Sequence, residues 1–189
     1  MNRMTSITPS RTLAIVAALA LVGACSDQPP LAPHATPSVQ AQVAPPAQAI
    51  ATRQAVATLQ RVTARYHDLQ VAIDEGFVLL HPCENRPDEG PVGIVYVNFD
   101  RLMDGVADPS SPDALVYEPG RNGRPQLVGV EFAIPYALWT APQPPEFLGA
   151  TFQREDEFGV YGLHVWVWRN NPNGLFEEAN PRVSCGEVE

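Results

Sequence analysis

Two residues that could do chemistry together, Glu131 and His164, lie in separate segments that alternate like β-strands. Residues 127–134 and 161–168 are rich in β-branched and aromatic residues, which favours strands. The aliphatic face of the first segment would carry Val128, Val130, Phe132 and Ile134. Side chains two residues apart on a strand share a face. If both aliphatic faces pack on one core, Glu131 and His164 share the opposite face.

Three interpretations of this opposite face are open. Glu131 and His164 can simply pair as a structural element of a partly exposed sheet. Trp166 and Trp168 follow His164 on the same predicted face. They can wall a pocket for a small or sugar-like ligand, because indole rings offer apolar area and an N–H donor. The third interpretation is a metal site or an acid–base site.

A metal site would need a third ligand. Histidine and carboxylate side chains suit a divalent metal such as zinc or non-haem iron, but two ligands are too few. His81, in the segment HPCEN, is the obvious third candidate beside Glu131 and His164. The sequence has no GxSxG, HExxH, P-loop or EF-hand motif, and no GxGxxG follows a predicted strand. We therefore assign no catalytic residue and favour a non-enzymatic role over an enzyme.

The first 24 residues are typical of a secretory signal peptide. Arg3 and Arg11 precede an uninterrupted apolar or small run, residues 12–24, which is too short to span a bilayer core of about 30 Å. Residues 21–24, Leu-Val-Gly-Ala, precede Cys25 and resemble a bacterial lipobox. This resemblance implies that diacylglycerol is added to the Cys25 thiol, that the chain is cut before Cys25, and that fatty acid such as palmitate anchors it.

The expected mature chain starts with a proline-rich spacer and is strongly acidic. Residues 25–47 bury nothing and are typical of a disordered linker. Ser26 is not the aspartate associated with inner-membrane retention, which favours the outer membrane, at its periplasmic face or at the cell surface. Removing residues 1–24 takes away two arginines and no acid, so the net charge changes from −9 to −11. Because phosphate binding needs clustered cations, we expect no nucleic-acid partner.

Two further cysteines, Cys83 and Cys185, remain once Cys25 is assigned to lipid. In an oxidising compartment such as the cell envelope, a disulfide between them is the default. Two free buried thiols are the alternative. A disulfide would tie the segment after the first predicted helix to the C-terminal end.

Residues 48–189 predict a single globular α+β domain. Apolar residues at spacings of three and four predict one long helix over residues 49–75, ended by Gly76. Its apolar stripe consists of Val56, Leu59, Val62, Tyr66, Leu69 and Ile73. Strands are expected at residues 92–99, 114–117, 127–134 and 161–168, with a hairpin turn at 118–125. This order favours one helix packed on a curved antiparallel sheet, as in a cystatin- or NTF2-like roll, and a β-sandwich with an N-terminal helix is the alternative.

Residues 163–185 resemble a group of uncharacterised exported bacterial proteins that share the pattern LHVWxWxxNPxGxFxxxNPxVSC. The resemblance extends to residues 65–67, 76–77, 92–98 and 127–132. Such relatives often carry a histidine at the position of Val95, which implies a His/Glu/His set of which this chain lacks one member. The leading hypothesis is a lipid-anchored domain that binds a small ligand or an envelope protein. The alternative is a metal-dependent enzyme that uses His81, Glu131 and His164.

Overall fold

The computed structural model describes residues 46–87, 89–120 and 123–186. The helical elements are α1 (Pro46–Thr63), a 3₁₀ helix (Ala64–His67), α2 (Leu69–Asp74), α3 (Phe99–Leu102) and a 3₁₀ turn (Tyr136–Leu138). The strands are β1 (Val78–Arg86), β2 (Gly90–Val97), β3 (Ala114–Glu118), β4 (Gln126–Pro135), β5 (Glu146–Phe147), β6 (Ala150–Thr151), β7 (Gln153–Glu155) and β8 (Val160–Val165). In the described part of the chain, no helix is long and apolar enough to cross a membrane.

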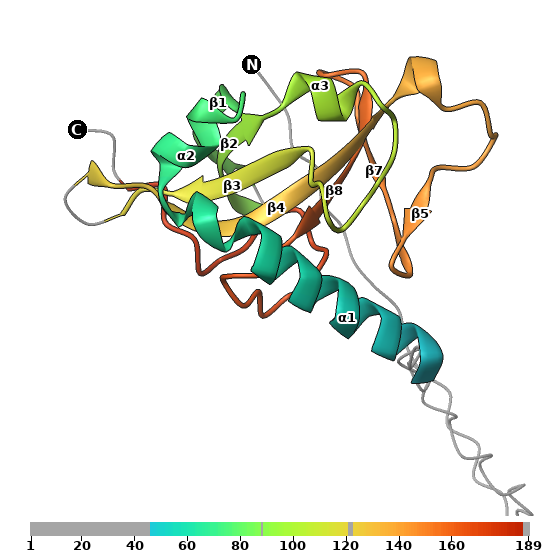
Figure 1. The fold of residues 1–189 in the computed structure, drawn as a ribbon, viewed down its shortest axis with the longest axis horizontal. Helices are drawn as coiled ribbons and strands as arrows, with labels where there is room; N and C mark the ends of the chain where they lie inside the picture. Colours follow the sequence, from blue (N-terminus) through green and yellow to red (C-terminus); the bar gives the residue numbers. More distant parts are fainter. Residues whose placement is uncertain (1–45, 88, 121–122, 187–189) are drawn as a thin grey trace, which may run out of the picture. The chain divides into compact units, whose positions relative to one another are not determined.

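Six strands form one antiparallel sheet in the order β1-β2-β3-β4-β8-β7, and β5 pairs only with β6. The sheet curls into a half-barrel, and α1 runs across one of its faces (Figure 1). The predicted α+β class, with a helix packed on a curved antiparallel sheet, is confirmed. The alternative of a β-sandwich does not form, because the long strands all belong to a single sheet.

The predicted helix over residues 49–75 is interrupted. Asp68 has an extended backbone, and its side chain accepts a hydrogen bond from the Gln70 amide, so it caps a new helix. This break shifts the helical phase, and Ala72 is buried while the predicted Ile73 is 44% exposed. The helical region ends before Gly76, whose φ of +92° is a conformation that glycine adopts without strain.

Two irregular stretches of the sheet differ from the predicted pattern. β1 was not predicted, because it contains Pro82 and pairs with β2 through three register shifts. As an edge strand it tolerates the proline, which lacks a backbone donor. In β4, a register shift moves Val128 to the face opposite Val130. A bulge places two residues against one, so simple alternation fails at that point.

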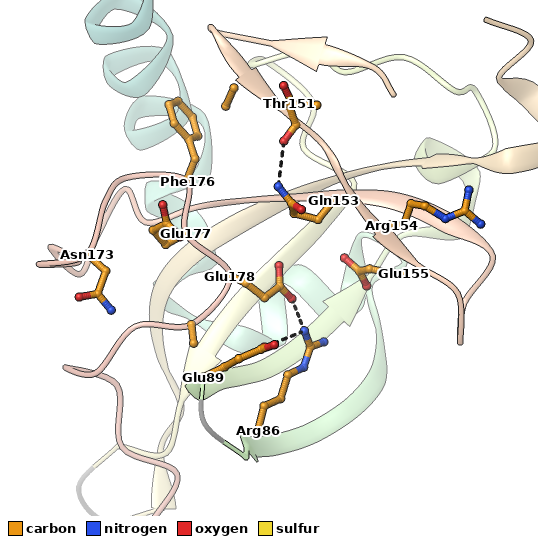
Figure 2. A pocket seen from close by; sticks show the side chains of 12 residues that line it. Arg86, Glu89, Thr151, Gln153, Arg154, Glu155, Asn173, Phe176, Glu177 and Glu178 are labelled. Atoms are coloured by element: carbon orange, nitrogen blue, oxygen red, sulfur yellow. Dashed lines mark hydrogen bonds and ion pairs between the residues drawn. The ribbon is translucent and has the colours of Figure 1, made fainter. Parts of the chain in front are cut away.

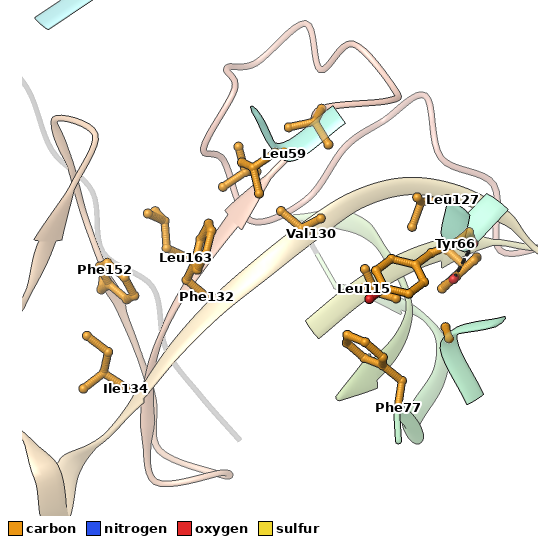
Figure 3. Close-up of a cluster of buried hydrophobic side chains, with 14 residues drawn as sticks. Leu59, Tyr66, Phe77, Leu115, Leu127, Val130, Phe132, Ile134, Phe152 and Leu163 are labelled. Atoms are coloured by element: carbon orange, nitrogen blue, oxygen red, sulfur yellow. Dashed lines mark hydrogen bonds between the residues drawn. The ribbon is translucent and has the colours of Figure 1, made fainter. Parts of the chain in front are cut away.

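The two faces of the sheet carry separate hydrophobic clusters. The first lies between the helices and the sheet and includes Leu59, Tyr66, Phe132 and Leu163 (Figure 3). The second lies on the opposite face and consists of Val95, Val97, Ala114, Val116, Val128, Trp166 and Val183. Burial of these apolar surfaces is the main force that holds the sheet between the helix and the C-terminal segment.

The segment after β8, residues 166–186, has no helix or strand and covers the second face of the sheet. Trp166 Nε1 donates to the Glu177 carbonyl oxygen at 2.6 Å, and Val183 packs in the second cluster. Cys185 forms a disulfide with Cys83 of β1, with a Cα–Cα distance of 5.2 Å. The predicted disulfide is therefore confirmed, and it fixes the C-terminal segment to the edge strand.

Candidate functional site

Glu131 and His164 are direct cross-strand partners in β4 and β8. The distance from His164 Nε2 to Glu131 Oε2 is 3.2 Å, and the residues are only 3% and 6% exposed, respectively. Strand alternation thus correctly predicted that the two side chains share a face. Removing two ionisable groups from water is costly unless they pair, so this contact must satisfy both groups.

Both ring nitrogens of His164 face oxygen atoms. Nε2 faces the Glu131 carboxylate, and Nδ1 lies 2.8 Å from the Glu178 carbonyl oxygen, which can only accept a hydrogen bond. A doubly protonated ring satisfies both contacts. Burial lowers the pKa of His164, but the charges of Glu178 and Glu131 and the hydrogen bonds outweigh burial and raise the pKa to about 10.

Glu131 is the anionic partner of this imidazolium. Burial raises the pKa of Glu131, but the charge and hydrogen bond of His164 outweigh it and lower the pKa below its ordinary value. The charge of His81 and a hydrogen bond from Glu155 act in the same direction. The pair is therefore a buried ion pair at neutral pH.

Glu155, at the end of β7, is a third member of the site that the sequence analysis missed. An added Cβ at Gly162 would overlap Glu155 Oε1 and would lie 3.1 Å from Glu131 Oε1. The absence of a side chain at Gly162 therefore lets both carboxyl groups gather over β8. The only sequence signal was a charged run, Arg154 to Glu157, that is typical of a turn.

The carboxyl group of Glu155 donates a hydrogen bond to Glu131. Its Oε1 atom is buried and accepts no hydrogen bond from an N–H or O–H group of the described residues. Burial, and then the charges of Glu131 and Glu178, raise the pKa of Glu155 to about 8. Glu155 is therefore mostly protonated at neutral pH, beside an ionised Glu131. We call Glu131, Glu155 and His164 the buried Glu–Glu–His cluster.

Two cavities meet at Glu155. A polar cavity of about 820 Å³ is lined by residues of β1, β6, β7 and the C-terminal segment, including Arg86, Glu155 and Glu178 (Figure 2). An apolar cavity of about 110 Å³ has both Glu131 and Glu155 in its lining. The other lining residues of the apolar cavity are Leu80, Val97, Phe99, Leu102, Ala114, Ala133, Phe158 and Val160. Glu155 thus lines both a polar space and an apolar one.

The arginines of the polar cavity are already paired with acidic side chains. Arg86 Nη1 lies 2.7 Å from Glu178 Oε1, and Figure 2 shows this arginine between Glu178 and Glu89. Arg154 Nη2 lies 2.6 Å from Asp156 Oδ1, and its guanidinium stacks on an aromatic ring. Neither cation is left to neutralise an anionic ligand.

The two tryptophans do not wall a pocket together. β8 ends at Val165, so the predicted alternation does not extend through residues 166–168. Trp166 is buried in the second cluster, whereas Trp168 turns to the helix side, where Nε1 donates to Thr63 Oγ1 at 3.1 Å. The expectation that Trp168 shares a face with His164 is therefore wrong.

His81 lies on the edge strand β1, opposite Val95. Its ring stacks on Phe158 at 6.2 Å between centroids, and its Nδ1 lies 2.9 Å from the Pro82 carbonyl oxygen. Within residues 46–87, 89–120 and 123–186, no three His, Cys, Asp or Glu side chains are arranged to hold a metal ion. The structure brings Glu131 and His164 together but does not add His81 as a third ligand.

Comparison with known proteins gives no relative. No family model matches the chain, and no curated protein or solved structure is significantly similar to it. The resemblance of residues 163–185 to exported bacterial proteins therefore stays a prediction. The buried Glu–Glu–His cluster and the two cavities beside it are the features of the fold that suggest a function.

Two members of the cluster, together with the buried Asp113 of the segment before β3, predict that the domain loses stability as the pH rises. The pKa values of Asp113, Glu155 and His164 are raised to about 7, 8 and 10, respectively. Burial is the main cause for the two acids. For His164, burial lowers the pKa, but the charges of Glu178 and Glu131 and the hydrogen bonds outweigh it. Each group binds more protons when folded, so its stabilisation is complete at low pH and is lost as the pH passes the folded pKa. The lowered pKa of Glu131 changes the stability only below about pH 4.5, the ordinary pKa of this group.

We expect the free energy of unfolding, from urea denaturation, to be lower at pH 9 than at pH 6. Asp113 Oδ2 accepts a hydrogen bond from the Ala133 amide, which asparagine can replace. Asp113→Asn should therefore make the dependence shallower between pH 5 and pH 7 and leave the slope above pH 8 unchanged. A free energy that stays constant or rises from pH 6 to pH 9 would contradict the assigned protonation states.

Proposed function

We propose that this chain is a lipid-anchored, extracytoplasmic domain that binds a small ligand in the polar cavity. The observation that carries the proposal is the polar cavity between β1, β6, β7 and the C-terminal segment, which has Arg86, Glu155 and Glu178 in its lining. The cavity volume of about 820 Å³ is in the range of small-molecule sites.

A metal-dependent enzyme is the weaker alternative. A metal site needs at least three suitable ligands with open geometry, and the described residues offer no such group. The ring nitrogens of His164 are engaged by Glu131 and by the Glu178 carbonyl oxygen, so neither is free for a metal ion. A binding function needs no change in these contacts.

A cavity-filling variant tests the binding function. Ala150 lines the polar cavity from β6, so Ala150→Phe places a ring where a ligand would lie. We expect a library of amines, polyols, amino acids and carboxylates to give compounds that shift the NMR signals of cavity residues. Those shifts should disappear in Ala150→Phe.

The matched control is Ala137→Phe, an exposed position in the turn after β4 that lines neither cavity. This variant should bind the same compounds as the native chain. Shifts that are scattered over the surface, or that persist in Ala150→Phe, would reject the polar cavity as the binding site.

The lipid anchor rests on Cys25, which lies outside the described residues. We expect intact-mass analysis of the chain from a bacterial membrane to show cleavage before Cys25 and the added mass of diacylglycerol. A Cys25→Ser chain should remain uncut and unlabelled by fatty acid, whereas Ser26→Ala should be processed normally. An unmodified Cys25 thiol in the native product would remove the basis for the proposed location, and two or more acyl chains would support it.

A further inference from the structure

We propose that the end of the sheet where β3 ends and β4 begins binds an acidic oligosaccharide. Three hollows of about 540, 310 and 520 Å³ lie at this end. The first two share Gln126 and Arg169 in their linings, and the last two share His67, so the hollows adjoin one another. We call their combined surface the arginine groove, because Arg124, Arg169 and Arg182 line it. It has no lining residue in common with the polar cavity, so it is a separate site.

The arginine groove has more cations than anions, in a chain whose formal net charge is −9. Its lining has three arginines but only two acids, Glu118 and Asp68. Both acids have partners, since Glu118 pairs with Arg169 and Asp68 accepts a hydrogen bond from the Gln70 amide. The other two arginines are exposed and form no ion pair within residues 46–87, 89–120 and 123–186. The net charge of the chain repels a polyanion, so binding is expected only where cations gather.

The side chain of Asn180 holds two of the arginines in place. Asn180 is fully buried, and its Nδ2 donates to the Arg169 carbonyl oxygen at 3.1 Å. Its Oδ1 accepts a hydrogen bond from the Arg182 amide at 3.0 Å. The amides of Trp168 and Arg169 both donate to the Val128 carbonyl oxygen, which ties this stretch to β4. The backbone of the groove is therefore ordered before a ligand binds, which lowers the entropic cost of binding.

The positions of the two exposed arginines indicate a ligand with charges spaced along its length. Arg182 lines the first hollow and Arg124 lines the third, and these two hollows share no lining residue. A guanidinium group pairs with a carboxylate through two parallel hydrogen bonds. A single small anion can therefore use only one of the two exposed arginines, whereas an oligomer with a carboxylate on each unit can use both.

The middle hollow suits a sugar ring. Its lining includes the half-buried Trp168 and the exposed Gln126. The indole ring offers apolar area, and the amide can donate and accept hydrogen bonds. A sugar ring presents an apolar face and hydroxyl groups, which match these two side chains. Carboxylates on either side of such a ring would reach toward the hollows that hold Arg124 and Arg182.

NMR titration of the full chain with trigalacturonate, the trimer of galacturonic acid, tests the proposal. At low ionic strength we expect it to bind at least tenfold more tightly than neutral maltotriose, triglutamate or inorganic phosphate. The Gln126 amide signal and the Trp168 indole N–H signal should shift. Binding should weaken as salt is added, because the arginine charges are exposed and are screened.

Removing the two exposed arginines tests their role. Arg124→Gln/Arg182→Gln should weaken trigalacturonate binding about tenfold, since two exposed ion pairs are lost. Each single variant should give part of this loss, which keeps the test decisive if the double variant does not fold. The matched control is Arg53→Gln/Arg61→Gln, which removes the same charge from exposed positions of α1 outside the groove. It should bind like the native chain.

Four results would overturn the proposal. Equal binding of maltotriose would show that charge is not recognised, and equal binding of triglutamate or phosphate would show that the sugar is not. An equal loss of binding in the α1 control would reduce the effect to net charge. Shifts confined to the polar cavity, at Ala150 and Gln153, would place the ligand there and would leave the proposed binding function intact.

Discussion

Replacing His164 with alanine is expected to lower the free energy of unfolding by about 3–5 kcal/mol, because it leaves Glu131 as a buried charge without its partner. The two side chains are almost fully buried and lie 3.2 Å apart. The lost hydrogen bond from Nδ1 to the Glu178 carbonyl oxygen adds to the cost, since that oxygen loses a donor. Urea denaturation at pH 7 measures the change.

A second consequence of His164→Ala concerns the acids. Without the imidazolium, the Glu131 and Glu155 carboxyl groups lie together and the positive charge on β8, between β4 and β7, is gone. Both pKa values should rise, since the charge of His164 no longer opposes burial at either carboxyl group. NMR titration of the carboxyl carbons would detect the rise.

Two controls separate the ion pair from general disruption. His67→Ala removes an exposed histidine that touches Trp168, and it should cost less than about 1 kcal/mol. The double variant Glu131→Leu/His164→Leu removes both charges, and it should be more stable than His164→Ala alone, because buried pairs are often replaced by apolar residues at little cost. If His164→Ala costs less than 1 kcal/mol, the pair is not the buried ion pair described above.

Strand alternation was enough to predict that Glu131 and His164 share a face, because β4 and β8 pair without a register shift through these residues. The same rule failed for Val128, where a bulge adds a residue, and for Trp168, which lies beyond the last residue of β8. Alternation holds only while the strand is regular, and the isolated Gly129 beside Val128 was the sequence signal for the bulge.

Glu155 could not be found from sequence because its surroundings come from three distant segments. β7 has only three residues and follows the two-residue strands β5 and β6, so no alternation identifies it. The space for its carboxyl group exists because Gly162 has no side chain, and the charge that raises its pKa comes from Glu131 and Glu178. Only the folded sheet brings these groups together.

Removing the disulfide is the second change with a large expected effect. Cys83 and Cys185 are separated by 102 residues. Closing a loop of about 100 residues stabilises a fold by up to about 4–5 kcal/mol in the chain-entropy model. The variant Cys83→Ser/Cys185→Ser should therefore lose up to that amount of unfolding free energy in urea denaturation. Reduction of the native chain should give the same loss.

The disulfide should also matter for the candidate site. It fixes the end of the segment that carries Glu177 and Glu178, which line the polar cavity, to the edge strand β1. Without the disulfide, we expect faster amide hydrogen exchange in this segment and weaker binding in the cavity, whereas Ser184→Ala, an exposed neighbour of Cys185, should change neither. If the double serine variant loses less than 1 kcal/mol and keeps the native exchange pattern, the other attachments of the segment hold it without the disulfide. These include the packing of Trp166 and Val183 in the second cluster and the hydrogen bond from the Asn180 amide to the Pro91 carbonyl oxygen.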